Sequence, residues 1–238
     1  MIYVLPDIHG NERRFQSIMK QIRLQPSDTL YILGDVIDRH PGGICILQQI
    51  MAMPNAKMLL GNHEYMMLRA LGVPYDDNFD TGTALLHWYR NGGQVTHDHF
   101  HQLHDSAQTR IIDYLKGLPL DYDVEVGGVR YKLVHGAPAE DFERDQDPRY
   151  LNPVHFAVWK RLSAEGEPTH DYTLIFGHTP TRHYQDCIPM EIWRQRDRIG
   201  IDCGSGYPED KDDPIRPYGR LACLRLDDGQ VFYSEEDQ

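Results

Sequence analysis

Cysteine is scarce in this sequence, and its few copies follow no pattern. The four cysteines are far apart, and none belongs to a C-x-x-C pair. A disulfide framework or a zinc knuckle needs closely paired cysteines, so the spacing argues against both. We therefore expect free thiols in a reducing compartment at four positions, Cys45, Cys187, Cys203 and Cys223.

Long hydrophobic runs and an excess of positive charge are also missing. No stretch approaches the roughly 18 apolar residues that span a bilayer, and the first residues lack the basic and apolar regions of a secretory signal. The net charge of −12 argues against a broad nucleic-acid or anionic-membrane surface. We therefore expect a cytoplasmic protein without a nucleic-acid or membrane partner. The negative net charge does not exclude a phosphorylated substrate, because bound metal cations would reverse the sign of the local field.

The length and the hydrophobic pattern of the chain predict one α/β domain over residues 1–238. Its length and its 40% hydrophobic content suffice for a single large core. The first part alternates between two patterns, which are strand-like runs at 2–5, 29–33 and 57–60 and helical spacing at 15–22 and 44–51. Such alternation favours parallel strands with helices on the faces of the sheet.

The middle of the chain predicts helices and the last part predicts strands. Residues 63–118 indicate a helical subdomain beside the site, with helical spacing at 81–90 and 99–118 and a loop at 75–80. The later strand-like runs are 122–126, 129–134, 173–176, 198–202, 220–226 and 231–233, with a helical segment at 154–162 and a charged loop at 209–217. Gly127-Gly128 and Asp227-Asp228-Gly229 are typical of hairpin turns.

Polar side chains follow the first three strand-like runs. The stretches are Asp7-Ile8-His9-Gly10, Gly34 to Arg39 and Gly61-Asn62-His63-Glu64. Ligands bind at the carboxyl ends of strands in open α/β sheets, so these side chains can share one pocket. Their mixture of oxygen and nitrogen donors suits manganese, iron or zinc. The six candidates are Asp7, His9, Asp35, Asp38, Asn62 and His63.

Two later histidines stand in comparable settings. His135 ends an apolar run and precedes Gly136, and His178 follows Gly177 after another apolar run. Both are predicted at strand ends, where the adjacent glycine lets a ligand approach the backbone.

Five motifs in this order carry a family resemblance. D-x-H, G-D-x-x-D-R, G-N-H-E, V-H-G and G-H-T, spread over residues 2 to about 204, resemble the metallophosphoesterase superfamily. Within it the chain resembles the phosphoprotein phosphatase family, especially its short bacterial and phage members, and is similar to dinucleoside-polyphosphate hydrolases. The resemblance implies a calcineurin-like α/β sandwich of two mixed β-sheets flanked by helices, with a helical insertion.

The resemblance also implies a binuclear metal centre. Asp7, His9 and Asp35 would hold one metal, and Asp35 would bridge to a second, completed by Asn62, His135 and His178. Two metals about 3.5–4 Å apart can stabilise the attacking and leaving oxygens of an in-line displacement, and a bridging hydroxide would be the nucleophile. We expect two divalent ions, Mn²⁺ first, with iron or zinc as alternatives.

Four further residues receive substrate or catalytic roles. The resemblance implies that His63 pairs with Asp38 and protonates the leaving oxygen, since a neighbouring carboxylate favours imidazolium. Arg39 resembles the family's phosphate-binding arginine, whose guanidinium can bind two oxygens. Arg161 is the candidate for a second such arginine, although a basic pair also suits an amphipathic helix.

Departures from the family motifs narrow the range of family members that the chain resembles. His40, Leu60 and Ala137-Pro138 differ from the eukaryotic members, which argues against their regulatory subunits. Pro180 stands where phosphodiesterase-type relatives carry a second histidine, which favours phosphomonoesters.

Two sets of residues in the predicted helical subdomain at 63–118 have more than one interpretation. His97, His101 and His104 would share a helical face and could bind another metal, or could form a polar surface or a substrate rim. A second set, Trp88, Tyr89 and Asn91-Gly92-Gly93, resembles a stretch beside the site in bacterial members, or is ordinary core and turn.

These observations predict a metal-dependent phosphomonoester hydrolase. The predicted substrates are phosphoserine, phosphothreonine or phosphotyrosine on proteins, or a small phosphoester. The alternatives are hydrolysis of diadenosine polyphosphates, which uses the same motifs, and a non-catalytic interaction module. Loss of His63, Asp38 or the metal ligands would mark the last, and none is lost. No oligomeric state is predicted.

Overall fold

Two mixed β-sheets form the centre of the computed structural model, which describes residues 1–73, 80–165, 170–207 and 219–235. Among these residues the strand orders are β10-β9-β1-β2-β3 and β4-β5-β6-β8-β7. The strands are β1 (Ile2–Leu5), β2 (Thr29–Ile32), β3 (Ala56–Met58), β4 (Asp121–Val126), β5 (Val129–Val134), β6 (Thr173–Phe176), β7 (Trp193–Gln195), β8 (Arg198–Gly200), β9 (Ala222–Arg225) and β10 (Val231–Tyr233). Strand β1 pairs in parallel with β2 and antiparallel with β9, and β6 pairs in parallel with β5 and β8.

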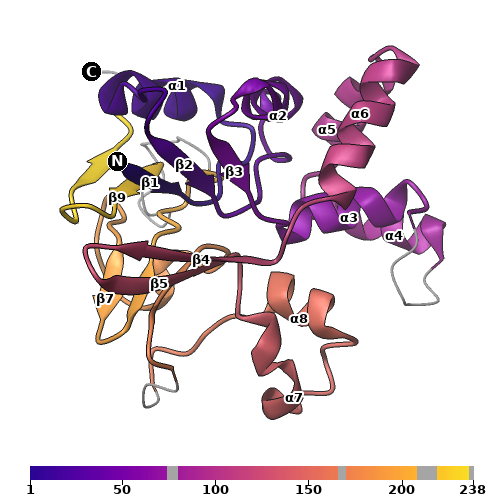
Figure 1. Ribbon diagram of the computed structural model, residues 1–238. Coiled ribbons are helices and arrows are strands. Elements are labelled where there is room, and N and C mark those ends of the chain that lie inside the picture. Colours follow the sequence, from indigo (N-terminus) through magenta and orange to yellow (C-terminus); the bar gives the residue numbers. More distant parts are fainter. Residues whose placement is uncertain (74–79, 166–169, 208–218, 236–238) are drawn as a thin grey trace.

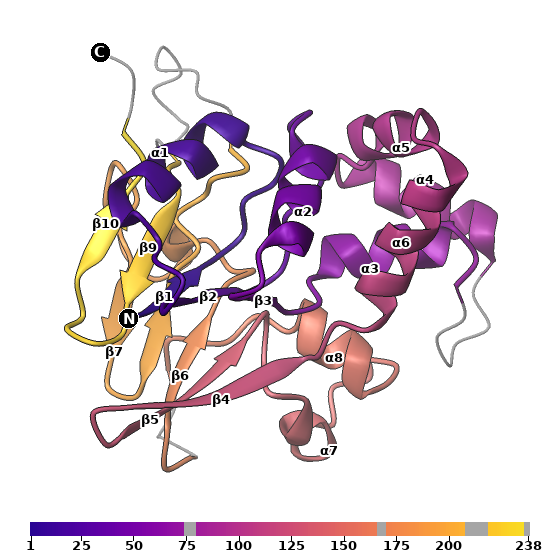
Figure 2. The same cartoon turned by 45° about the horizontal axis from the view of Figure 1, so that its top comes forward.

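Helices flank the two sheets, as predicted. They are α1 (Glu12–Ile22), α2 (Gly43–Ala52), α3 (Asn62–Ala70), α4 (Thr81–Arg90), α5 (Gln94–His101), α6 (Asp105–Lys116), α7 (Phe142–Asp145) and α8 (Pro153–Trp159), with 3₁₀ turns at Ala139–Asp141 and Thr181–His183. Helices α1 and α2 cover the first sheet, and α3 to α6 gather at one side of the molecule (Figure 1). The turned view shows β4 and β5 crossing below the first sheet (Figure 2).

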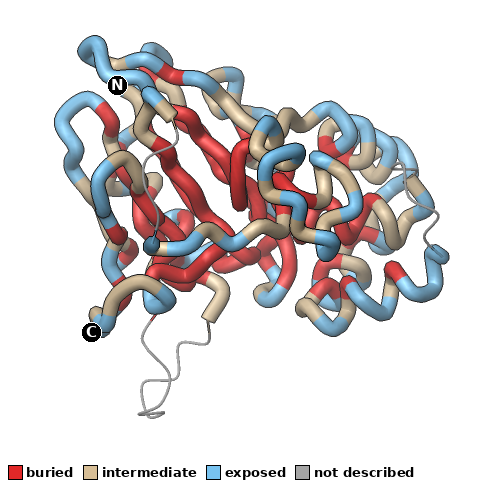
Figure 3. Tube along the Cα trace, turned by 90° about the horizontal axis from the view of Figure 1, so that it is seen from below, coloured by how far each residue is buried: buried red, intermediate tan, exposed pale blue. Residues whose placement is uncertain are grey.

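Alternating side chains of β1 explain the layers. Tyr3 and Leu5 pack with Phe15 of α1 in one buried cluster, whereas Val4 packs with Leu133 of β5 in another. Successive strand residues point to opposite faces, so one short apolar run contributes to both cores. Figure 3 shows the buried strands as a continuous red band between exposed outer segments.

Helix α1 shows how a sequence signal becomes packing. The Asn11 side chain accepts a hydrogen bond from the Arg14 backbone N–H and caps the helix. The apolar residues Phe15, Ile18 and Ile22 follow at helical spacing and are buried. The capped, amphipathic segment therefore covers the sheet and fixes the direction in which the chain leaves β1.

Most of the predicted elements are present, but one predicted helix is divided in two, and helix α7 lies where no element was predicted. Gly127 and Gly128, with φ of +58° and +81°, join β4 to β5, and Gly229 lies in the turn between β9 and β10, so both hairpins are confirmed. The single helical stretch at 99–118 is wrong. Helix α5 ends at His101 and α6 begins at Asp105, because the His104 side chain accepts from the Ser106 backbone N–H as a cap. Strand β7 was not predicted.

Three other predictions are not decided by the fold. Residues 75–79 of the first predicted loop and residues 209–217 of the second lie outside the described residues. The single domain over 1–238, with a subdomain at 63–118, stays a prediction. None of the helices in the described ranges has the length and apolar character to cross a membrane, and cytoplasmic location also stays a prediction.

Candidate active site and metal centre

The carboxyl ends of five strands converge on one site. Asp7 and His9 follow β1, Asp35 and Asp38 follow β2, and Asn62 and His63 follow β3 at the start of α3. From the second sheet, His135 follows β5 and His178 follows β6. These eight side chains are all buried. The structure therefore brings together every metal-binding residue predicted from the sequence, although the five strands are spread over more than 170 positions of the chain.

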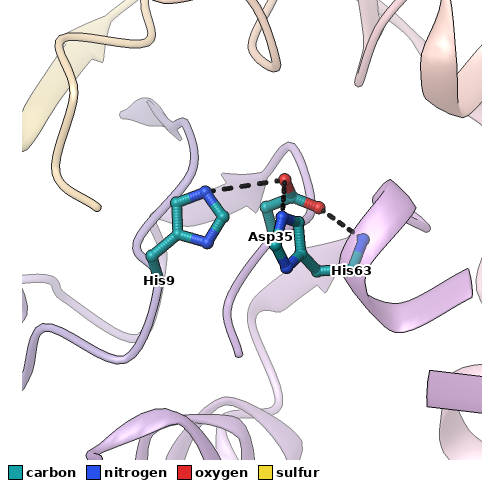
Figure 4. Close-up of side chains that lie close together, drawn as sticks. All are labelled: His9, Asp35 and His63. Carbon is teal, nitrogen blue, oxygen red and sulfur yellow. Dashed lines mark hydrogen bonds and ion pairs between the residues drawn. The ribbon is translucent and has the colours of Figure 1, made fainter. Parts of the chain in front are cut away.

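Asp35 lies at the centre of this site. Its Oδ2 is 3.7 Å from His9 Nε2, and its Oδ1 is 3.5 Å from His135 Nε2. Figure 4 shows the Asp35 carboxylate facing both the His9 ring and the His63 ring. Among the residues that the structure describes, two groups of side chains have donor atoms within 4.8 Å of one another, His9–Asp35–His63 and Asp35–His135–His178. Both groups contain Asp35, which is the arrangement that a bridging carboxylate requires.

Backbone carbonyls orient three of the imidazoles. His9 Nδ1 lies 3.2 Å from Ile37 O, His135 Nδ1 lies 2.7 Å from Leu33 O, and His178 Nε2 lies 3.2 Å from Trp159 O. A carbonyl oxygen only accepts, so these ring nitrogens carry the hydrogen and donate. The other nitrogen of each ring then presents a lone pair, as in many metal-binding histidines.

Burial keeps the same three rings neutral. It lowers the pKa of His9, His135 and His178, well below the usual value for His9 and His178. A neutral imidazole is the form that binds a metal. Both the neutral state and the orientation of these three rings therefore suit metal binding.

Buried carboxylates give the site a negative character. Burial, with the charges of Asp202 and Asp35, raises the pKa of Asp7 well above its usual value. Burial likewise raises the pKa of Asp202 to about 6. Grouped carboxylates of this kind are stabilised by cations, so the donor set fits divalent metal ions.

The contact between Asn62 and His135 supports the same fit. Asn62 Oδ1 lies 3.0 Å from His135 Nε2. Because His135 Nδ1 already carries the ring hydrogen, both of these atoms are acceptors. A cation between them would satisfy both lone pairs.

His63 differs from the three other imidazoles. Its Nδ1 lies 2.6 Å from Asp38 Oδ2, and its Nε2 lies 3.3 Å from a terminal nitrogen of Arg39. Burial opposes protonation, but the Asp35 and Asp38 carboxylates raise the pKa of His63 above its usual value. Arg39 can only donate, so His63 Nε2 accepts this bond and Nδ1–H donates to Asp38. The raised pKa makes His63 easier to protonate than the three rings held by carbonyls.

Trp88 completes the Asp38–His63 pair and had no role assigned from the sequence. Its indole Nε1–H donates to Asp38 Oδ2 over 2.7 Å, and the ring is fully buried. A Cβ on Gly93 would lie 2.3 Å from this indole, so the Asn91-Gly92-Gly93 turn must contain glycine there. The sequence signal was the resemblance of this stretch to bacterial family members. No local sequence pattern shows that Trp88 bonds to Asp38, which is 50 positions away in the chain.

Two arginines lie at the edge of the site. Arg39 is exposed, and its backbone N–H donates to Gly92 O over 3.1 Å. Arg161 is also exposed and lies just beyond α8, whose last capping residue is Lys160. It is near enough to contribute to the pKa changes of His178 and Asp202. Arg161 is therefore outside the helix that the sequence suggested for it.

Glu64 organises the backbone beneath the site, which the sequence did not reveal. Its carboxylate accepts N–H bonds from Gly61, Asp35, Val36 and Ile37 at 2.8–3.3 Å. Burial, with the neighbouring Asp35 charge, raises the pKa of Glu64 to about 7. A glutamate three residues after a helix cap is a capping-box signal, and it could have indicated this role.

Several site residues have an unusual backbone. His9, Asp35, Asp38, Arg39 and His178 have φ between +50° and +73°. Left-handed backbone at such residues costs about 1–3 kcal/mol each and persists where the surroundings enforce it. Gly177 shows one such constraint, since a Cβ there would lie 2.4 Å from Asp7 Oδ2. This glycine admits the Asp7 carboxylate, which accepts the His178 N–H over 3.0 Å.

Comparison with known proteins gives the family of this chain. Residues 1–202 match the calcineurin-like phosphoesterase family. The chain is 32% identical over 187 residues to serine/threonine-protein phosphatase 2 of Escherichia coli (strain K12), covering 74% of this chain and 78% of that protein. It is 25% identical over 196 residues to a symmetrical bis(5'-nucleosyl)-tetraphosphatase of Paracidovorax citrulli (strain AAC00-1), covering 81% of this chain and 62% of that protein.

A solved structure shares the fold. A metallophosphoesterase from Sphaerobacter thermophilus superposes with a TM-score of 0.57 over 99% of this chain and 88% of its own, at 17% identity. The predicted resemblance and the two-sheet fold are thus confirmed. Members of this family use divalent metal ions, and the groups around Asp35 are able to bind them. The chain belongs to the calcineurin-like phosphoesterase family.

Proposed function

We propose that this protein is a metal-dependent phosphomonoester hydrolase that acts on phosphoserine, phosphothreonine or phosphotyrosine in proteins. The observation that carries the proposal is the His63–Asp38 pair, joined over 2.6 Å beside two donor groups that share Asp35. A proton donor next to a cation site is what cleavage of a phosphate ester needs, because the leaving oxygen must be protonated.

Six side chains would hold the metals. We assign Asp7, His9 and Asp35 to one ion and Asn62, His135 and His178 to the other, with Asp35 shared. Bound there, two divalent cations would supply Lewis acidity toward phosphoryl oxygens and a nucleophilic hydroxide. The oxygen and nitrogen donors suit Mn²⁺, with iron or zinc as alternatives.

The chain's own residues bind the phosphoryl group and deliver the proton. The Arg39 and Arg161 guanidinium groups bind phosphoryl oxygens at the exposed edge of the site. In the structure His63 Nε2 accepts from Arg39. Once Arg39 turns to a phosphoryl oxygen, Nε2 is free to take up a proton and give it to the leaving oxygen. Asp38 accepts from His63 Nδ1–H and so keeps Nε2 directed toward the substrate and the imidazolium stable.

The choice of a phosphoprotein over a dinucleotide rests on the relatives. The protein phosphatase match covers 78% of that protein, whereas the tetraphosphatase match covers 62% of its counterpart. Hydrolysis of diadenosine polyphosphates is the second candidate, since symmetrical bis(5'-nucleosyl)-tetraphosphatases are also among the relatives.

A direct comparison of substrates tests the proposal. We expect kcat/KM to be higher for phosphoserine and phosphothreonine peptides than for diadenosine tetraphosphate, with Mn²⁺ present in both assays. The reverse order would replace the protein substrate with a phosphoanhydride. Absence of Mn²⁺-stimulated hydrolysis of p-nitrophenyl phosphate as well would favour a non-catalytic interaction module.

A further inference from the structure

Two histidines on α5 form a close pair outside the catalytic site. His97 and His101 are one helical turn apart, and their Nε2 atoms are 2.7 Å apart. Their ring centroids are 4.2 Å apart at 80°. Side chains at i and i+4 lie on the same face of a helix, so the backbone itself keeps the two rings together.

We propose that His97 and His101 form a separate binding site for one borderline divalent ion such as Zn²⁺, Ni²⁺ or Cu²⁺. Zinc–nitrogen bonds of about 2.0–2.1 Å at a tetrahedral angle place two ligand atoms about 3.3–3.4 Å apart. The observed separation of 2.7 Å needs to widen by about 0.6–0.7 Å, and the His101 ring is exposed and has room to move. The ion would replace the single proton that the two Nε2 atoms share.

Tyr89 prepares His97 for this role. The Tyr89 hydroxyl lies 2.6 Å from His97 Nδ1. When Nε2 binds an ion, Nδ1 carries the hydrogen and donates to the hydroxyl oxygen. Metal-binding histidines have such a partner on their other nitrogen, which fixes the ring and the tautomer.

The surroundings of His97 also favour the neutral ring. Partial burial and the nearby His101 lower the pKa of His97, against a raising contribution from Asp98. The His97 ring packs edge-on against Trp88 at 5.6 Å between centroids, which limits its rotation. One ligand is therefore restrained while the other is open to solvent, where water can complete the coordination.

His104 does not belong to this site, contrary to the helical face expected from the sequence. Helix α5 ends at His101, and His104 Nδ1 instead accepts from the Ser106 N–H. The site therefore has two imidazole ligands. Such a pair prefers nickel, copper and zinc to manganese, so its ion differs from the one proposed for the catalytic centre.

Zinc titration of the Mn²⁺-saturated full chain tests the site. We expect the wild-type protein to bind one more Zn²⁺ than either His97→Gln or His101→Gln. Any exchange of Zn²⁺ into the catalytic centre occurs in all three proteins, so the difference isolates the histidine pair. His99→Gln is the matched control, because residues two apart do not share a helical face, and it should retain the extra ion.

Tyr89→Phe provides a second measurement. Removing the hydroxyl should weaken Zn²⁺ binding at this site about 10–100-fold without changing the number of ions. Circular dichroism and thermal unfolding identify any variant that fails to fold. Equal stoichiometry and affinity in the wild-type, His97→Gln and His101→Gln proteins would overturn the proposal, as would an equal loss in His99→Gln.

Discussion

His63 is the residue at which the protonation chemistry can be tested. Its Nδ1 is held by Asp38, and the carboxylates raise its pKa against the effect of burial. The three other buried imidazoles of the site are held by carbonyls, and their pKa values are lowered. One residue type therefore has two chemical states within a single site, and its hydrogen-bonding partner determines which.

Replacing His63 should affect substrates unequally. We expect His63→Ala to reduce kcat by about 10²–10⁴-fold for an alkyl phosphate, because general-acid catalysis supplies about that factor. An activated aryl phosphate needs little protonation of its leaving group and should lose much less. The check is kcat for both substrates at one Mn²⁺ concentration, and equal losses would remove His63 as the proton donor.

Trp88 should act on catalysis through Asp38. Trp88→Phe removes the 2.7 Å bond to Asp38 Oδ2 and keeps most of the buried ring. A hydrogen bond to a charged group contributes about 1.5–3 kcal/mol, so we expect kcat to fall about 10–100-fold with little change in KM.

Trp193→Phe is the matched control for the indole. Trp193 is buried in the separate cluster on the second sheet, with Phe176 and Leu174. Its loss should lower stability and leave kcat nearly unchanged. A similar fall in kcat for both variants would mean that Trp88 acts only through packing.

At the scale of elements, Glu64 ties the end of β2 to the start of α3. Glu64→Gln keeps the size of the side chain but replaces one acceptor oxygen with a donor that faces backbone N–H groups. Leaving such buried donors without partners costs about 1–3 kcal/mol. We expect that decrease in the free energy of unfolding, measured with urea, whereas exposed Glu125→Gln should change it little. Equal free energies of unfolding in Glu64→Gln and Glu125→Gln would contradict the role of Glu64 in holding the end of β2 to the start of α3.

The same elements show what a sequence can predict. Strand-like runs followed by Asp, His or Asn predicted β1, β2, β3, β5 and β6 and the polar groups after them, because both signals are local. Asp202 carries the same signal at the end of the 198–202 run and was overlooked, although it is buried beside Asp7.

Other features depend on contacts that no local pattern contains. The Trp88–Asp38 bond joins residues 50 positions apart. The left-handed backbone at His9 and His178 is imposed by the packing around them. The break between α5 and α6 was missed because His104 was assigned to a helical face instead of to a cap.

At the scale of the whole molecule, the two sheets are incomplete without each other. The first supplies Asp7, His9, Asp35 and Asn62, and the second supplies His135 and His178. Asp35 contacts His9 from the first sheet and His135 from the second. Removing its carboxylate should therefore abolish both the binding of two ions and catalysis. Activity should thus require two divalent ions that share Asp35.

Measuring turnover against bound metal tests this claim most directly. We would strip the purified protein with a chelator, add Mn²⁺ in known equivalents, and follow hydrolysis of p-nitrophenyl phosphate beside the metal content. We expect no turnover without metal, full turnover at two equivalents, and neither two bound ions nor turnover in Asp35→Asn. Unchanged turnover in the stripped protein, or two ions and full turnover in Asp35→Asn, would contradict it.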